Sequence, residues 1–138
     1  MSKRRLTDTD YARLLEFRTE LRRFVRWSEE QALAQGLTTG QHQLLLAVRG
    51  HPGPQAPTIG DVAESLLLRH HSATGLVDRT VNAGYLRRLP DEDDHRVVRL
   101  EITAAGATKL QRLSRRHLEE LERLRGQTFG EIAVRGAR

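Results

Sequence analysis

The sequence of 138 residues contains no cysteine. This absence excludes disulfide bonds, thiolate zinc sites and a cysteine redox switch. No apolar run approaches the roughly 20 residues that a membrane-spanning helix requires. The first residues, MSKRRLTDTD, are basic but have no apolar segment behind them, so they do not resemble a secretory signal. We therefore expect a soluble cytoplasmic protein.

The motifs that carry catalysis are also missing. The sequence has no Gly-x-Ser-x-Gly elbow, no phosphate-binding glycine loop and no residues at metal-ligand spacing. Ser72 is close to His70 and His71, but adjacent histidines on a helix point about 100° apart. A zinc site would need side chains from several helices, and His42 and His117 could meet only through the fold. We expect no enzyme activity, no cofactor and no bound metal, and keep a metal-responsive regulator as an alternative.

The net charge of +5 and the sequence pI of about 10.6 favour polyanionic partners. The excess is not concentrated where a DNA-binding region would need it. Between residues 69 and 99, six arginines face five acids, which leaves only +1. Most of the excess lies in the two terminal regions, so an argument for DNA must rest on individual arginines.

Hydrophobic periodicity and capping residues predict a mainly α-helical chain with one β-hairpin. Thr38 or Thr39, Thr58 and Thr103 are expected helix caps, and Leu44, Leu45, Leu46 and Val48 are expected to point inward. Three prolines and a glycine make 51–57 a loop, and Pro90 to Asp94 is expected to form the hairpin turn. The predicted helices are 10–34, 39–50, 58–66, 70–83 and a long one after Thr103, and the predicted strands are 85–89 and 97–102.

The order of elements from Thr58 to Thr103 is helix, turn, helix and a two-stranded wing. This order is typical of a winged helix-turn-helix, which puts one helix into a DNA major groove and a hairpin beside it. The acidic turn and the nearly neutral charge of this region favour the alternative of a module that binds protein and not DNA.

The two terminal helices carry apolar stripes that a small winged head cannot cover. The first includes Leu14, Leu21 and Phe24, and the last includes Leu113 and Leu121. We expect these helices to pack on each other and on a second copy of the chain. The expected organisation is an N-terminal dimerisation helix (1–36), a DNA-binding region (37–102) and a C-terminal dimerisation helix (103–138), in one structural domain.

Three segments resemble the MarR family of bacterial winged-helix transcription regulators: LTTGQHQLLLAV at 37–48, SATGLVDRTVNAGYLRR at 72–88 and DDHRVVRLEITAAG at 93–106. The resemblance implies a homodimer with interlocked terminal helices, binding to a pseudo-palindromic operator, repression, and release by a small ligand. The acidic turn from Asp91 to Asp94 and the short C-terminal end, VRGAR, depart from the family pattern.

The helix from His70 offers small hydroxyl residues and an arginine toward DNA, and we expect base-edge and phosphate contacts there. Asp94-His95-Arg96 is similar to the family's wing-tip motif, in which the arginine enters the minor groove and the aspartate holds it. The simpler interpretations are that Ser72 only caps its helix and that Arg79 pairs with Asp78 or Glu64. The predicted DNA-binding residues are His70, His71, Ser72, Thr74, Gly75, Arg79, Arg87, Arg88, Asp94, Arg96 and Arg99.

The resemblance places an effector in the cleft between the dimer helices and the reading head. Arg23, Phe24, Trp27 and His42 are the candidate ligand-binding residues, and a small aromatic or phenolic anion would suit an apolar pocket with one arginine. The alternative is that Phe24 and Trp27 belong to the core or the dimer interface.

Overall fold

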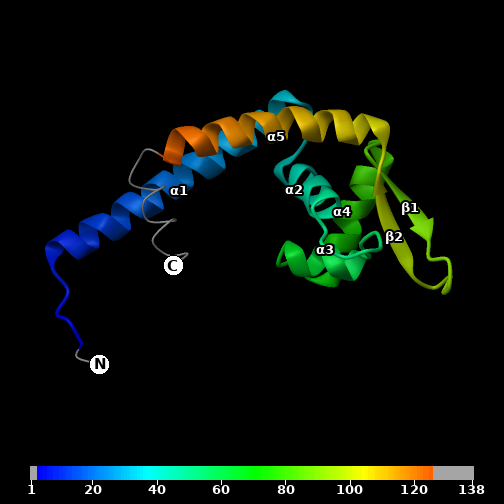
Figure 1. The fold of residues 1–138 in the computed structure, drawn as a ribbon, viewed down its shortest axis with the longest axis horizontal. Coiled ribbons are helices and arrows are strands. Elements are labelled where there is room, and N and C mark those ends of the chain that lie inside the picture. The colour runs from blue at the N-terminus through cyan, green and yellow to red at the C-terminus, as the bar shows by residue number, and fades with distance from the viewer. Residues whose placement is uncertain (1–2, 126–138) are drawn as a thin grey trace.

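The computed structural model describes residues 3–125, which form five α-helices and one two-stranded antiparallel sheet (Figure 1). The mainly helical winged-helix fold expected from the sequence is confirmed. The elements are α1 (Asp8–Ala34), α2 (Thr39–Arg49), α3 (Ile59–Ser65), α4 (His70–Asn82), β1 (Leu86–Pro90), β2 (Val98–Ile102) and α5 (Ala104–Arg125).

Three helices begin with the same N-terminal capping motif. A threonine hydroxyl accepts a hydrogen bond from the backbone three residues on, and that third residue bonds back to the threonine N–H. These capping boxes pair Thr7 with Asp10 in α1, Thr38 with Gln41 in α2 and Thr58 with Asp61 in α3. The expected cap at Thr58 is confirmed, and of Thr38 and Thr39 it is Thr38 that caps α2. The first helix begins two residues earlier than expected, since α1 starts at Asp8 and not at residue 10.

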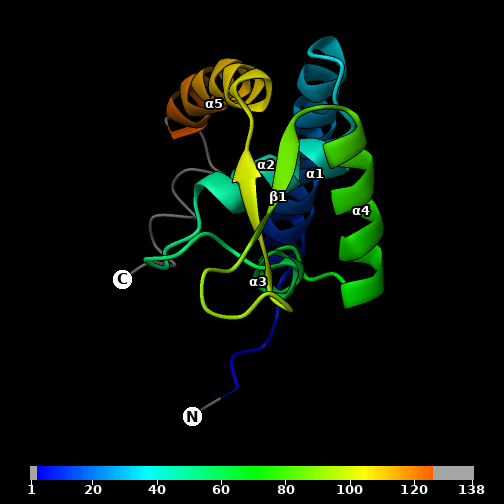
Figure 2. The ribbon, with the colours of Figure 1, turned by 90° about the vertical axis from the view of Figure 1, so that its right-hand side faces the viewer.

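The head consists of α2, α3, α4 and the hairpin, packed around one apolar core (Figure 2). Leu44 and Leu45 of α2 meet Val77 of α4 and Leu100 of β2, all of them fully buried. The β1 and β2 strands pair in register from Leu86 opposite Ile102 to Pro90 opposite Val98. The head therefore holds α4 and the hairpin in fixed relative positions.

The passage from the hairpin into α5 depends on Gly106. A Cβ atom there would come within 2.2 Å of the Tyr85 carbonyl oxygen, so only glycine fits. Thr103 caps the helix as expected: its hydroxyl accepts from the Gly106 N–H at 3.1 Å and donates to the Gly84 carbonyl at 2.7 Å. These contacts fix where α5 leaves the head.

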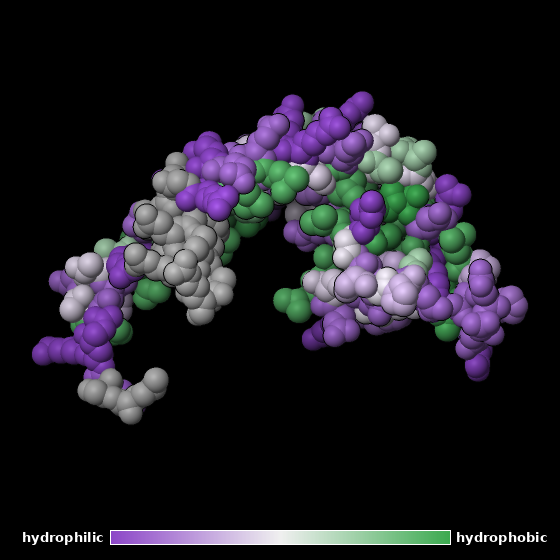
Figure 3. Space-filling view, viewed as in Figure 1, coloured by the Kyte–Doolittle hydropathy of each residue, from purple (hydrophilic) through white to green (hydrophobic). Residues whose placement is uncertain are grey.

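The two long helices, α1 and α5, form an arch above the head, and the N-terminal half of α1 extends beyond it (Figure 1). Arg116 of α5 donates to the Gln31 side chain of α1 at 2.7 Å near the centre of the arch. Hydrophobic atoms are visible along the inner side of the arch, whereas its outer ridge over α5 is mostly hydrophilic (Figure 3). Several large apolar side chains remain exposed on these helices: Tyr11, Leu14, Leu15, Val25, Leu118 and Leu121.

Some local expectations were wrong. Leu46 does not point inward and is 52% exposed, because three consecutive helical residues cannot all face one core. Pro90 ends β1 instead of opening the turn, and the strands begin one residue later than expected. The short C-terminal end, VRGAR, lies outside the described residues. No helix among residues 3–125 is long and apolar enough to cross a membrane.

Candidate nucleic-acid interface

The N-terminal end of α4 presents a polar surface. His70, His71 and Ser72 are exposed, whereas the next residue, Ala73, is buried. Arg69 is the N-cap residue of α4 and no side chain caps this helix, so the interpretation of Ser72 as a cap is wrong. Thr74 donates its hydroxyl to the His70 carbonyl at 3.0 Å, which leaves its oxygen able to accept a further bond. This end of α4 offers unpaired N–H groups and hydroxyls together.

Arg79 lies one turn further along α4 and folds back over Gly75. A Cβ at Gly75 would be 3.3 Å from the Arg79 guanidinium, so this glycine leaves room for the arginine along the helix surface. Arg79 does not pair with Asp78 or Glu64 within the described residues. Asp78 instead accepts from Arg88 of β1. The exposed Arg79 is therefore available to a phosphate or a base.

Asp94 and Arg96 form a forked pair at the wing tip. Arg96 donates to the Asp94 carboxylate through Nε at 3.1 Å and Nη2 at 3.2 Å, and through its backbone N–H at 3.1 Å. These hydrogen bonds, the side-chain bond first, hold the pKa of Asp94 below its ordinary value. The Arg96 side chain remains 90% exposed. The aspartate thus orients a cation without burying it.

Asp91 and Arg99 form a second pair at the base of the turn. The Arg99 Nε lies 2.6 Å from Asp91 Oδ1, and this bond is the main cause that lowers the pKa of Asp91. Two of the four acids in the turn are therefore paired within the wing. Glu92 and Asp93 are exposed, and neither forms an ion pair within residues 3–125. The acidic turn repels a phosphate backbone less than its composition indicates.

The two arginines of β1 are also partly engaged. Arg88 donates to Asp78, and Arg87 lies 3.9 Å from the Glu101 carboxylate across the hairpin. Sequence reasoning did not select Arg69 or His95, although both are exposed, Arg69 at the start of α4 and His95 at the wing tip. Their positions directly beside predicted contact residues could have identified them.

Three of the four candidate effector residues come together around His117 of α5. The His117 ring centroid lies 4.8 Å from that of Trp27, 4.9 Å from that of His42 and 6.1 Å from that of Phe24. Arg23 instead pairs with Glu20 on the same helix, at 2.5 Å. His42 and His117 therefore do meet through the fold, but residues 3–125 contain no group of three or more His, Asp or Glu side chains placed to hold a metal ion.

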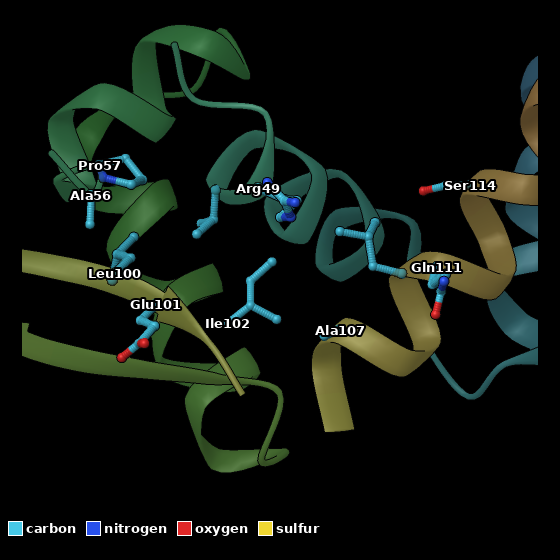
Figure 4. Close-up of a pocket in the computed structure, with 11 residues that line it drawn as sticks. Arg49, Ala56, Pro57, Leu100, Glu101, Ile102, Ala107, Gln111 and Ser114 are labelled. Carbon is cyan, nitrogen blue, oxygen red and sulfur yellow. The ribbon is translucent and has the colours of Figure 1, made fainter. Parts of the chain in front are cut away.

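A cavity of about 690 Å³ lies between α5 and the head (Figure 4). Its walls come from α2, the 51–57 loop, β2 and α5, and none of the four candidate effector residues lines it. Four polar side chains, Arg49, Glu101, Gln111 and Ser114, contribute to a mostly apolar lining. The remaining lining residues are Val48, Ala56, Pro57, Leu100, Ile102, Ala107 and Leu110.

The helix-turn-helix of α3 and α4, the hairpin beside it and the two long flanking helices define a winged-helix protein. A family model described as the MarR family matches residues 35–97. Two relatives are similar in sequence. The HTH-type transcriptional regulator PecS of Dickeya dadantii is 29% identical over 60% of this chain and 50% of its own length. The transcriptional activatory protein BadR of Rhodopseudomonas palustris is 33% identical over 53% of this chain and 42% of its own length.

Solved structures share the fold. The crystal structure of a MarR family transcription regulator superposes with a TM-score of 0.78 at 20% identity, covering 94% of this chain and 85% of that one. The structure of AbsC from Streptomyces coelicolor gives 0.72 at 21% identity, covering 88% and 81%. The S. aureus MepR–DNA complex gives 0.73 at 16% identity, covering 96% and 93%.

Residues 35–97 therefore match the MarR family, and the described chain has the winged-helix fold of solved MarR-family structures. The chain spans half the length of PecS and less than half that of BadR. Both relatives are named as transcription proteins, which agrees with the expectation that the chain is not an enzyme.

Proposed function

We propose that the protein binds double-stranded DNA in a sequence-specific way and regulates transcription as a homodimer on a pseudo-palindromic operator. The observation that carries the proposal is the forked Asp94–Arg96 pair, because it presents an oriented and almost fully exposed guanidinium at the tip of a wing. Such an arginine suits the minor groove, where the negative potential is concentrated when the groove is narrow.

The recognition helix in this proposal is α4. His70, His71, Ser72, Thr74 and Gly75 would approach base edges or phosphates in the major groove, together with Arg79 and Arg69. Arg87 and Arg88 would contact the backbone beside the wing. Arg99 is the weakest of the predicted contacts, because its guanidinium already has three partners within the chain.

The dimer is supported by the apolar surface that one chain leaves uncovered. Leu14 and Leu15 on the projecting half of α1 are 59% and 65% exposed, and Leu118 and Leu121 are exposed on α5. An apolar surface of this kind on two adjacent helices is typical of an interface. In a two-fold dimer, the two α4 helices would enter successive major grooves roughly 34 Å apart.

Ligand-responsive repression is part of the proposal. The cavity between α5 and the head lies where the long helices join the reading head. A small aromatic or phenolic effector with an acidic group would place its ring on the apolar lining and its acidic group toward Arg49, away from the negatively charged Glu101 carboxylate. Because such a ligand would contact both parts, it would favour one of two dimer geometries over the other. The cluster of Phe24, Trp27 and His42 is the alternative site for this effector.

Selection of bound fragments from genomic DNA, followed by footprinting and titration at several salt concentrations, tests the proposal. A dimer that neutralises several phosphates loses affinity steeply as salt is added. The logarithm of the binding constant falls against the logarithm of the salt concentration with a slope of about 0.9 per phosphate. A protein-binding module would select no fragment and would not bind duplex at all. A repressor and an activator differ in the position of the footprint relative to the promoter.

A further inference from the structure

The loop before α3 is joined to the wing through Arg99. Arg99 donates from three nitrogens: Nε to Asp91 Oδ1 at 2.6 Å, Nη1 to the Ala56 carbonyl at 2.7 Å and Nη2 to Gln55 Oε1 at 2.7 Å. The backbones follow the same path, because Leu100 N–H donates to the Pro57 carbonyl at 2.8 Å. The loop and the base of the wing therefore form one hydrogen-bonded unit.

The second oxygen of Asp91 continues the connection toward the wing tip. Asp91 Oδ2 accepts from the backbone N–H of Asp93 at 3.1 Å and from that of Asp94 at 3.0 Å. Asp94 in turn accepts from Arg96. The Val97 N–H closes the turn on the Asp94 carbonyl at 3.0 Å. An unbroken chain of hydrogen bonds thus runs from Gln55 to the guanidinium of Arg96.

The burial of these groups separates two roles for arginine in the wing. The Arg99 side chain is 21% exposed and that of Asp91 is 12% exposed, whereas the Arg96 side chain is 90% exposed. The three bonds of Arg99 hold its guanidinium against the loop and Asp91, and turning the whole group toward a phosphate would break them. A largely enclosed charge with several hydrogen bonds holds a conformation more effectively than a surface ion pair does.

We propose that Arg99 and Asp91 are positioning residues that order the wing tip before DNA arrives, with Gln55 and the Ala56 carbonyl as their anchors. This rests on the proposed DNA binding. A wing that is already ordered avoids the entropy loss of fixing a loop during association. Arg99 therefore raises operator affinity through Arg96 and makes no phosphate contact of its own.

The test compares the operator affinity of Arg99→Lys with that of the wild type in titrations at several salt concentrations. The lysine keeps the positive charge but cannot form the three hydrogen bonds of Arg99. We expect affinity to fall about tenfold with an unchanged salt slope, because no phosphate contact is lost. A direct phosphate contact predicts instead that Arg99→Lys binds nearly as well, and that Arg99→Ala lowers the slope by about one ion.

A double-mutant cycle with Arg96→Ala distinguishes an effect of Arg99 that acts through Arg96 from a general effect on the stability of the fold. If Arg99 acts through Arg96, Arg99→Lys has little further effect once Arg96 is absent. Additive losses would overturn the proposal. A wild-type protein that binds no duplex would instead remove the proposed function, so the two failures are distinguishable.

Two variants of the acidic turn control for charge. Asp91→Asn and Glu92→Gln each remove one negative charge, but Asp91 takes part in the chain of bonds and Glu92 does not. Electrostatics alone predicts tighter binding for both. We expect weaker binding for Asp91→Asn, and unchanged or tighter binding for Glu92→Gln. In the free protein, Asp91→Asn should speed hydrogen exchange at the Asp93 and Asp94 amides, and unchanged exchange would contradict the proposal.

Discussion

The Ser28 hydroxyl of α1 lies 2.7 Å from Nε2 of His117 on α5, although 89 residues separate them in the sequence. Nδ1 of the same ring lies 2.7 Å from the Leu113 carbonyl oxygen, which can only accept, so Nδ1 carries a hydrogen. His117 is therefore fixed by both long helices, and it faces the ring of His42 from the head. This cluster of side chains joins the arch to the head.

Acidification should destabilise the fold through His42. Burial, and secondarily His117, hold the pKa of His42 below its ordinary value, and the residue is 6% exposed. The unfolded chain then binds a proton more readily than the folded chain. The stabilising contribution is complete above pH 6.5 and decreases as the pH falls below it. Urea unfolding of the wild type and of His42→Phe between pH 5 and 8 should give a smaller pH dependence for the variant, and parallel profiles would disprove this role.

Removal of the wing-tip guanidinium should weaken DNA binding without affecting the fold. We expect Arg96→Ala to lower operator affinity tenfold or more, because an oriented minor-groove cation is lost. The thermal unfolding midpoint should not change, since the side chain is almost fully exposed. Arg123→Ala on α5 removes the same charge far along the arch and should bind normally. Equal affinities of Arg96→Ala and wild type at fixed salt would exclude Arg96 from the interface.

A charge on the projecting half of α1 should prevent dimer formation. We expect Leu14→Glu to shift the mass in sedimentation experiments from dimer to monomer at micromolar concentration, because it puts a carboxylate into an apolar interface. Leu67→Glu is a matched control on the head, where the leucine is 93% exposed, and it should remain dimeric. A dimeric Leu14→Glu variant would place the interface elsewhere.

Gly106 should be the least replaceable glycine of the described chain. Gly106→Ala would force the backbone at Tyr85 away from α5, and we expect a loss of about 1–3 kcal/mol in the free energy of unfolding. At Gly60 in α3 an added Cβ would meet only the Thr58 hydroxyl, at 3.6 Å. Gly60→Ala should be neutral or stabilise by up to about 1 kcal/mol in the same urea titration. Equal stabilities of the two variants would show that α5 can shift without cost.

The sequence could predict features that depend on neighbouring residues. The helix starts at Thr38 or Thr39 and at Thr58 follow from capping threonines before apolar helical patterns. The Asp94–Arg96 pair follows from the resemblance of Asp94-His95-Arg96 to the family's wing-tip motif. The role of Arg99 could not be predicted, because its partners Gln55 and Ala56 lie 44 and 43 residues away. An alternating strand pattern shows that Arg99 faces away from the core, but not which loop covers that face.

The same limit applies to the effector site. The resemblance predicts Trp27 and His42 near the cleft, and both do lie together, but around His117 from a third helix. The lining of the cavity depends on how α5 leaves the hairpin at Gly106. That geometry comes from contacts between distant segments, which hydrophobic periodicity does not encode.

Ala56 takes part in two features of the head. It lines the cavity between α5 and the head, and its carbonyl oxygen accepts a hydrogen bond from Arg99. A compound that enters the cavity therefore contacts the loop to which Arg99 attaches the wing. Binding can then be followed without any DNA, by recording the amide resonances of Asp93 and Asp94 during a ligand titration. It also means that a substitution at Ala56 made to enlarge the cavity will disturb the wing, and should not be interpreted as an effector variant alone.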